Sequence, residues 1–142
     1  MAGQQFWKRT GLVIAVAVVV NVAVYLIAKA AGVEILVPQG GSPTPLSVVP
    51  VVLFTIIPLV LAAVLILVLR RIGRSTQQIF AGVVVVGTAL SLLAPLTADL
   101  TVSNKLALAA MHVAAGLAAL LGLTPLVSTL DSETPVGVAS SH

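Results

Sequence analysis

Polar side chains are rare inside the apolar stretches of this sequence, so the few that occur there are the candidates for chemistry. His112 lies within such a stretch, and an imidazole can carry protons near neutral pH, hydrogen-bond a ligand or coordinate a metal. A metal site needs several such ligands, and the other histidine, His142, ends the sequence. We therefore expect no metal at His112. The open alternatives are a structural hydrogen bond between helices, or the handling of protons or a ligand.

A second group of polar side chains recurs at helical spacing. Asn21, Tyr25 and Lys29 are four residues apart, which places them in one stripe of a helix. Asn21 and Tyr25 can join neighbouring helices by hydrogen bonds, each of which is typically worth only about 1 kcal/mol in a membrane. We expect the long side chain of Lys29 to extend toward the membrane interface.

Prolines accompany the polar residues of two further segments. Thr55 shares a helix face with Pro58, and Thr88 and Ser91 share a face with Pro95. A proline within a membrane helix removes one backbone donor and leaves the carbonyl four residues earlier in need of another partner. The sequence therefore predicts helix kinks at Pro58 and Pro95.

The absence of other motifs excludes several classes of protein. The chain has no cysteine, which rules out disulfides, iron–sulfur clusters and cysteine-ligated zinc. Gly40 and Gly41 alone predict a turn and not a phosphate-binding loop. No carboxylate shares an apolar segment with His112, so no Ser-His-Asp arrangement is expected. We predict no catalytic set, no cofactor and a non-enzymatic protein.

The elements that position these side chains follow from composition. The 142 residues are 59% hydrophobic and 8% charged, with a mean hydropathy of +1.20, whereas soluble domains carry about a quarter charged residues. A chain this small cannot bury so much apolar surface by itself, so we expect a lipid bilayer to cover it. The net charge of +3 does not indicate nucleic acid, because the basic residues are scattered over segment ends and not clustered.

Four apolar segments are long enough to cross a membrane, for which about 20 residues suffice. Prolines and glycines between residues 32 and 47 predict the longest loop. The sequence therefore predicts an all-α, four-helix transmembrane bundle that forms a single domain over residues 1–142. Its helices are expected at about 11–30, 48–69, 79–98 and 106–130.

The basic residues predict the orientation of this bundle. Lys29 and Lys105 fall on one side, and a larger group falls on the other. That larger group is Lys8, Arg9, Arg70, Arg71 and Arg74. Cytoplasmic ends of membrane helices carry the excess of Lys and Arg, so both termini are expected in the cytoplasm.

The polar residues of the four helices are expected at similar depth. At 1.5 Å per residue, most of them lie roughly 8–11 Å below the outer boundary, and the halves nearer the cytoplasm are almost wholly aliphatic. We predict an outward-facing polar pocket above an apolar plug, formed by Asn21, Tyr25, Thr55, Thr88, Ser91 and His112. At its outer rim Asp99 can pair with Lys105, with Lys29 nearby. Asp99 can alternatively serve as an acidic partner of His112.

Two short patterns carry a resemblance to a known family. Residues 91–96 read Ser-Leu-Leu-Ala-Pro-Leu, and residues 111–116 read Met-His-Val-Ala-Ala-Gly. Together they resemble a family of small bacterial four-helix membrane proteins of unknown function, over about residues 10–128. The resemblance implies a multi-pass protein of the bacterial cytoplasmic membrane, with Pro95 and His112 as recurring polar landmarks, and it implies no activity.

The function that these observations favour is a structural or accessory subunit, or a small binding module with an outward-facing polar pocket. Small residues on the face of His112, such as Ala115 and Ala119, allow close helix packing and so permit a homo-oligomer or a larger membrane complex. The alternative is a small-solute or proton-linked transporter or sensor that uses His112. An intramembrane enzyme ranks below both.

Overall fold

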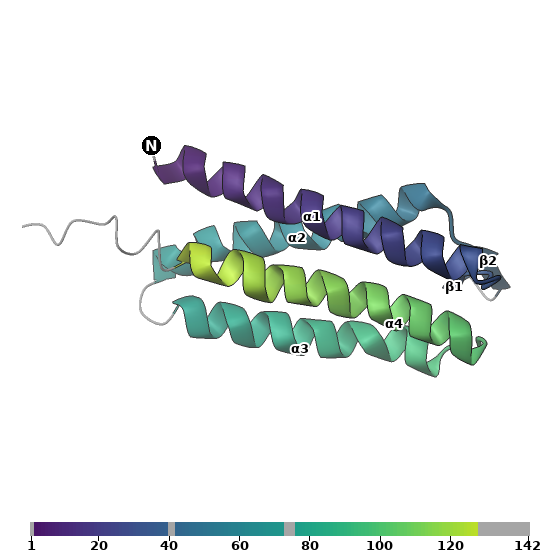
Figure 1. The fold of residues 1–142 in the computed structure, drawn as a ribbon. Coiled ribbons are helices and arrows are strands. Elements are labelled where there is room, and N and C mark those ends of the chain that lie inside the picture. Colours follow the sequence, from purple (N-terminus) through teal and green to yellow (C-terminus); the bar gives the residue numbers. More distant parts are fainter. Residues whose placement is uncertain (1, 40–41, 73–75, 128–142) are drawn as a thin grey trace, which may run out of the picture.

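The structure, a computed structural model, describes residues 2–39, 42–72 and 76–127. Within these residues, four helices are long and apolar enough to cross a membrane. The predicted all-α four-helix architecture is therefore confirmed (Figure 1). In chain order the elements are α1 (Ala2–Ala30), β1 (Leu36–Gln39), β2 (Ser42–Pro45), α2 (Val48–Ile72), α3 (Thr76–Thr97), α4 (Val102–Leu117) and the π-helix η1 (Ala118–Leu123).

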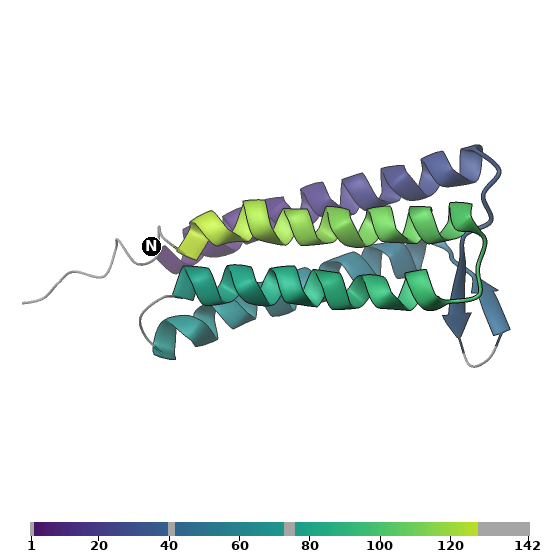
Figure 2. The same cartoon turned by 90° about the horizontal axis from the view of Figure 1, so that it is seen from below.

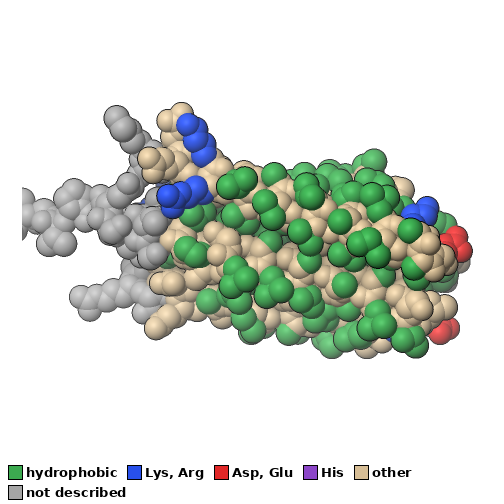
Figure 3. Space-filling model, viewed as in Figure 1, with side chains coloured by type: hydrophobic (Ala, Val, Ile, Leu, Met, Phe, Trp, Pro, Cys, Tyr) green, Lys and Arg blue, Asp and Glu red, His purple; other side chains and the backbone are tan. Residues whose placement is uncertain are grey.

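The helices form a bundle with two distinct ends (Figures 1 and 2). The N-terminus and the last described turn of the chain lie at one end, the terminal end, and the β1–β2 hairpin lies at the other, the hairpin end. On the face that Figure 3 shows, Lys, Arg, Asp and Glu gather at these ends and hydrophobic side chains cover the length between them. This distribution suits a protein whose middle lies in hydrocarbon.

The packing between neighbouring helices is uneven. α1 packs extensively on α2 and α4, and α3 packs on α4, whereas α2 and α3 make much less contact with each other. Figure 1 shows α2 and α3 close together near the terminal end and diverging toward the hairpin end. The separation between α2 and α3 is therefore greater in the half that carries the hairpin.

Local capping interactions explain two helix boundaries: the start of α4, which differs from the expected one, and the end of α1 at Ala30, which agrees with it. α4 begins at Val102, before the expected residue 106, because the preceding Thr101 is extended and its hydroxyl accepts a hydrogen bond from the backbone N–H of Asn104 at 3.3 Å. α1 ends before Gly32, whose φ of 79° suits glycine. The N–H groups of Gly32 and Val33 then close the C-terminal turn on helix carbonyls, each at 3.0 Å.

Other expected boundaries moved outward. α1 extends back to Ala2 and α2 continues through Arg70 and Arg71 to Ile72, because long basic side chains at helix ends continue a helix without breaking it. Arg74, His142 and the expected last helical residues after 127 lie outside the described residues.

The long loop expected between the first two helices contains a β-hairpin. β1 and β2 pair antiparallel, with Leu36 opposite Pro45. The hydroxyl of Tyr25 donates to the carbonyl oxygen of Leu46 at 3.0 Å, and the side-chain amide of Asn104 donates to that of Leu36 at 3.1 Å. These bonds attach the hairpin to α1 and α4, so it has a fixed position over its end of the bundle.

The buried hydrophobic residues form two clusters along the bundle. The cluster toward the terminal end centres on Ile66, Phe80 and Leu123, and the cluster toward the hairpin end includes Ile35 and Met111. Asn21, Thr55, Thr88, Ser91 and His112 lie along their helices between residues of the two clusters, whereas Tyr25 belongs to the cluster toward the hairpin end.

Candidate functional site

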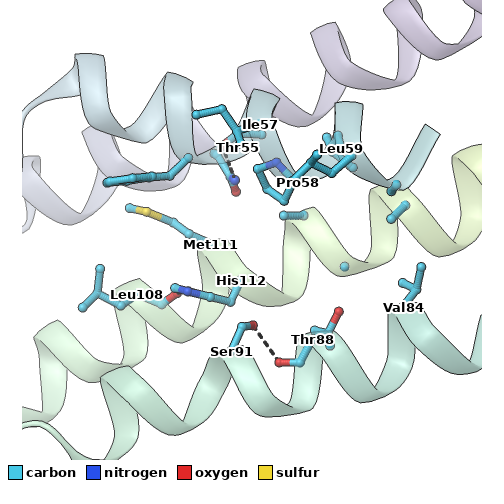
Figure 4. Close-up of a pocket in the computed structure, with 18 of the residues that line it drawn as sticks. Thr55, Ile57, Pro58, Leu59, Val84, Thr88, Ser91, Leu108, Met111 and His112 are labelled. Carbon is cyan, nitrogen blue, oxygen red and sulfur yellow. Dashed lines mark hydrogen bonds between the residues drawn. The ribbon is translucent and has the colours of Figure 1, made fainter. Parts of the chain in front are cut away.

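A cavity of about 780 Å³ opens where α2 and α3 diverge. Its wall is mostly aliphatic, and α4 contributes one side of it, with Leu108, Met111 and the small residues Ala115 and Gly116 (Figure 4). The polar side chains that line it come from all of the helices: Asn21 from α1, Thr55 from α2, Thr88 and Ser91 from α3, and His112 from α4.

Tyr25 is placed differently from the other residues of the predicted pocket. It is 4% exposed and belongs to the cluster under the hairpin. Its hydroxyl is bonded to Leu46, as described above, and it does not line the cavity. Helical spacing places Tyr25 and Asn21 in one stripe of α1. It does not show that the loop residue Leu46 accepts the hydrogen bond of Tyr25.

The rim of the cavity is exposed on the outer surface of the bundle. Phe54 and Leu61 on α2 are 63% and 62% exposed, and Val83 on α3 is 48% exposed. In a helix that crosses a membrane, this surface faces acyl chains. At the hairpin end the lining includes Val37 and Leu46. The cavity is thus accessible from the side, between two helices.

Asn21 is held in one orientation by its contact with Thr55. The hydroxyl of Thr55 donates its proton to the carbonyl oxygen of Val51 at 2.7 Å, so its oxygen can only accept from another group. Asn21 donates to that oxygen through Nδ2 at 2.8 Å. Its Oδ1 is buried without a hydrogen-bond partner in the described part of the chain. This oxygen has almost no accessible surface, so it is enclosed by neighbouring atoms and not open to the cavity.

His112 is bonded to its own helix. Its Nδ1 lies 2.7 Å from the carbonyl oxygen of Leu108, and the ring extends along α4 toward that residue (Figure 4). A carbonyl oxygen can only accept, so Nδ1 carries the proton, and in the neutral ring Nε2 is an acceptor. This bond lies within α4 and does not join two helices.

The α3 residues Thr88 and Ser91 also form a local bond. The hydroxyl of Ser91 donates to the carbonyl oxygen of Thr88 at 2.7 Å (Figure 4), which leaves the serine oxygen as an acceptor. Thr88 lies directly against Gly116 of α4. Pro58 and Pro95 both line the cavity and lie inside continuous helices.

The predicted outer-rim residues lie at the hairpin end without the expected ion pair. Lys105 donates through Nζ to the carbonyl oxygen of Leu96 at 3.2 Å, and Lys29 lies 5.8 Å from the ring centre of Tyr25. Asp99 is exposed. The pairing of Asp99 with Lys105 is not formed in the described residues, and the ammonium group of Lys105 bonds instead to the backbone at the end of α3.

Asn104 is a buried polar residue that the sequence did not single out. It is 1% exposed, and its amide fixes the hairpin whose residue Val37 helps to line the cavity. Thr101, three positions earlier, is a residue type that favours the N-cap of a helix. An N-cap at Thr101 predicts that the helix begins at residue 102, which places Asn104 in its first turn. No group of three or more potential metal ligands occurs among the described residues.

The fold and the site define the class of this molecule: a small, four-helix membrane protein with a cavity between two of its helices. The chain belongs to DUF6069, a family of unknown function, whose family model matches residues 1–129. The resemblance seen in the sequence is thereby confirmed. No curated protein and no solved structure matches the chain.

Proposed function

We propose that this protein is a non-enzymatic binding module that takes a small lipophilic molecule from the bilayer into the cavity between α2 and α3. Small-molecule sites in proteins are concave, mostly apolar, of about 300–1,000 Å³, and carry a few polar groups that orient the ligand. The cavity's volume of about 780 Å³ and its aliphatic wall with Asn21, Ser91 and His112 match that description.

The location of the rim supports a ligand that arrives through the membrane. The exposed rim residues, Phe54 and Leu61 on one side and Val83 on the other, are apolar. A polar solute would have to pass from water across this apolar rim, whereas a lipophilic molecule already dissolved in the bilayer meets no such barrier. The lateral opening is the observation that carries the proposal.

A phenylalanine that fills the cavity should abolish this binding. Gly87 lines the cavity, and a Cβ added there meets nothing within 4 Å, so Gly87→Phe can place its ring in the empty space. We expect a lipophilic molecule to co-purify with the wild-type chain and to fall at least about tenfold in Gly87→Phe, a loss of about 1.4 kcal/mol of binding free energy. Native mass spectrometry of the detergent-solubilised protein measures the bound fraction.

The control for that experiment lies on the same helix. Gly82 is exposed, does not line the cavity and also has open space around an added Cβ, so Gly82→Phe introduces the same side chain on the lipid-facing surface. It should retain the bound molecule at the wild-type level. Equal occupancy in both variants, or no bound molecule in the wild-type chain, contradicts the proposal.

The proposal includes an orientation in a bacterial cytoplasmic membrane, with both termini in the cytoplasm and the hairpin outside. Lys8, Arg9, Arg70 and Arg71 at the terminal end support it, since cytoplasmic helix ends are rich in such residues. The cavity then opens in the outer half of the bilayer. This gives the polar residues the outward-facing position that the sequence predicts.

Single cysteines test this orientation, because the natural chain has none. Ser42 lies in the exposed strand β2 and Gln4 lies near the start of α1. A membrane-impermeant maleimide should label Ser42→Cys in intact cells and label Gln4→Cys only after the membrane is permeabilised. The opposite labelling pattern would show that the orientation is reversed. Labelling of both cysteines in intact cells would contradict the four-span topology.

A proton-linked transporter or sensor is the second candidate function. It is favoured by His112, a titratable side chain in the lining of the cavity, because imidazole changes charge near neutral pH. An accessory subunit of a larger complex is the third. The binding module ranks first because it alone uses the lateral opening.

A further inference from the structure

We infer that the ligand of this cavity is a phospholipid, one acyl chain of which lies along the cavity with its methyl end toward the terminal end of the bundle. This inference rests on the proposed function and adds the class of the ligand and its direction. Three features of the cavity support it: its length, its closed floor and a positive charge beside its other end.

The cavity is long and runs parallel to the helices. Its lining extends from Val51 to Leu65 on α2 and from Val83 to Pro95 on α3, which at 1.5 Å per residue are lengths of about 21 Å and about 18 Å. Each leaflet contributes about 15 Å to a hydrocarbon core of about 30 Å, so the lining is at least as long as the layer that one acyl chain spans. A linear chain therefore fits the shape of this cavity better than a compact molecule does.

The cavity is closed toward the terminal end. Its lining stops at Leu65 on α2 and at Val83 on α3. The next large side chains in that direction are the fully buried Ile66 and Phe80, which pack with Leu123 in one hydrophobic cluster. This cluster forms a floor that a polar headgroup cannot enter without losing its water. The apolar end of the ligand therefore lies at the floor.

The polar groups midway along the cavity tolerate an apolar chain. Figure 4 shows Ser91 and His112 between Leu108, toward the hairpin end, and Val84, toward the terminal end. The side chains of Thr55, Ser91 and His112 are each hydrogen-bonded to a carbonyl group of their own helix. A hydrocarbon chain that lies beside them leaves these bonds intact.

A positive charge lies beside the hairpin end of the cavity. Lys105 precedes the lining residue Leu108 by one helical turn, and its Nζ bonds to the carbonyl oxygen of Leu96, which follows the lining residue Pro95. An ammonium group has three protons to donate, and hydrogen bonds from such a group to a phosphate are strong ones. The phosphate of a phospholipid is therefore the group that suits this end.

Two photoreactive phosphatidylcholines test the direction of the chain. They carry a diazirine on the same acyl chain, one near its carbonyl carbon and the other near its terminal methyl group. Met111 and Ala119 both line the cavity and are 7% and 6% exposed, so their contact with lipid on the outer surface is small. In nanodiscs the first probe should label Met111 and the second Ala119, each with a preference of at least about fivefold, because the two residues are about 12 Å apart along the helix. Peptide mass spectrometry identifies the labelled residue.

Variants of α3 provide the controls for this labelling. Gly87→Phe, which fills the cavity, should lower both labels at least about tenfold, whereas Gly82→Phe on the outer surface should leave them unchanged. The main comparison is made on the wild-type chain, so it does not depend on how well any variant folds. Labelling that is the same for both probes, or in the reverse order, overturns the inference.

A pair of lysine substitutions tests the position of the phosphate. Lys105→Gln should lower the amount of phospholipid that remains bound in native mass spectra about threefold, the size expected for one accessible charged contact. Lys29→Gln is the matched control, since Lys29 is at the same end but lies over the ring of Tyr25, which does not line the cavity. Equal retention in the two variants contradicts the assignment of a phospholipid.

The mass of the bound molecule separates this inference from the proposed function. If the wild-type chain retains a lipophilic molecule that Gly87→Phe loses, and that molecule is not a phospholipid, the proposed function stands and only the inference is wrong. If the wild-type chain retains no molecule and neither probe labels the cavity, the proposed function and the inference both fail.

Discussion

Gly122→Leu is expected to cause the largest loss of stability of any single substitution considered for this protein, about 3 kcal/mol. A Cβ added at Gly122 would lie 2.6 Å and 2.8 Å from the two methyl carbons of Val13. Val13 is β-branched and has one strongly preferred rotamer in a helix, so it cannot turn away. α1 and η1, which pack against each other, must therefore separate to make room for the new side chain. Thermal unfolding followed by circular dichroism in detergent measures the change.

The matched control for this prediction is Gly82→Leu. A side chain at Gly82 meets nothing within 4 Å, and leucine favours a helix over glycine by about 0.5–1 kcal/mol. This control should have a midpoint equal to or above that of the wild-type chain. If Gly122→Leu unfolds at the same temperature as Gly82→Leu, the close approach of α1 to the π-helix is not a determinant of stability.

Gly116→Ala is expected to destabilise the bundle by about 2 kcal/mol, because the added methyl group overlaps the side chain of Thr88. The cost should depend on that threonine. Thr88→Ala removes the hydroxyl and methyl groups that the new Cβ meets and leaves only the Cβ of residue 88, at 3.1 Å. In the Thr88→Ala background the same substitution should cost about 1 kcal/mol less. The free energies of unfolding of the four chains form a double-mutant cycle that gives this coupling.

Independent effects would contradict that prediction. If Gly116→Ala is equally costly with threonine or alanine at position 88, the destabilisation comes from another neighbour and α3 does not approach α4 through this pair. Both residues also line the cavity, so the cycle should be measured on protein freed of bound lipophilic molecules, whose binding would otherwise raise the apparent stability.

The polar layer was predictable in part. Asn21, Thr55, Thr88, Ser91 and His112 all line one cavity, and the reason they could be grouped is that helical rise converts sequence position into depth. That they form a functional site stays a prediction. Tyr25 has a similar depth, but its hydroxyl bonds to Leu46 beside the hairpin and not in the cavity. Depth along a helix does not predict which loop residue packs against it.

The character of the cavity was not predictable. The sequence favoured a polar pocket open to the outside, whereas the wall is mainly aliphatic and its exposed rim lies between α2 and α3. Which pair of helices diverges depends on how closely the other pairs pack. Gly116 against Thr88, and Gly122 against Val13, bring α4 close to α3 and α1. The sequence shows that these residues are small, but it does not show which side chains of neighbouring helices pack against them.

The sequence by itself determined the four apolar spans, the placement of charges at their ends and the depth of the polar residues, because hydrocarbon thickness and helical rise act on each segment separately. The tertiary structure decided the hairpin, the π-helix η1, the opening between α2 and α3 and the hydrogen-bond partners of Asn21 and Tyr25. These features depend on distances between segments far apart in the chain, as in the bond from Asn21 to Thr55. Residue type and local spacing carry no information about such distances.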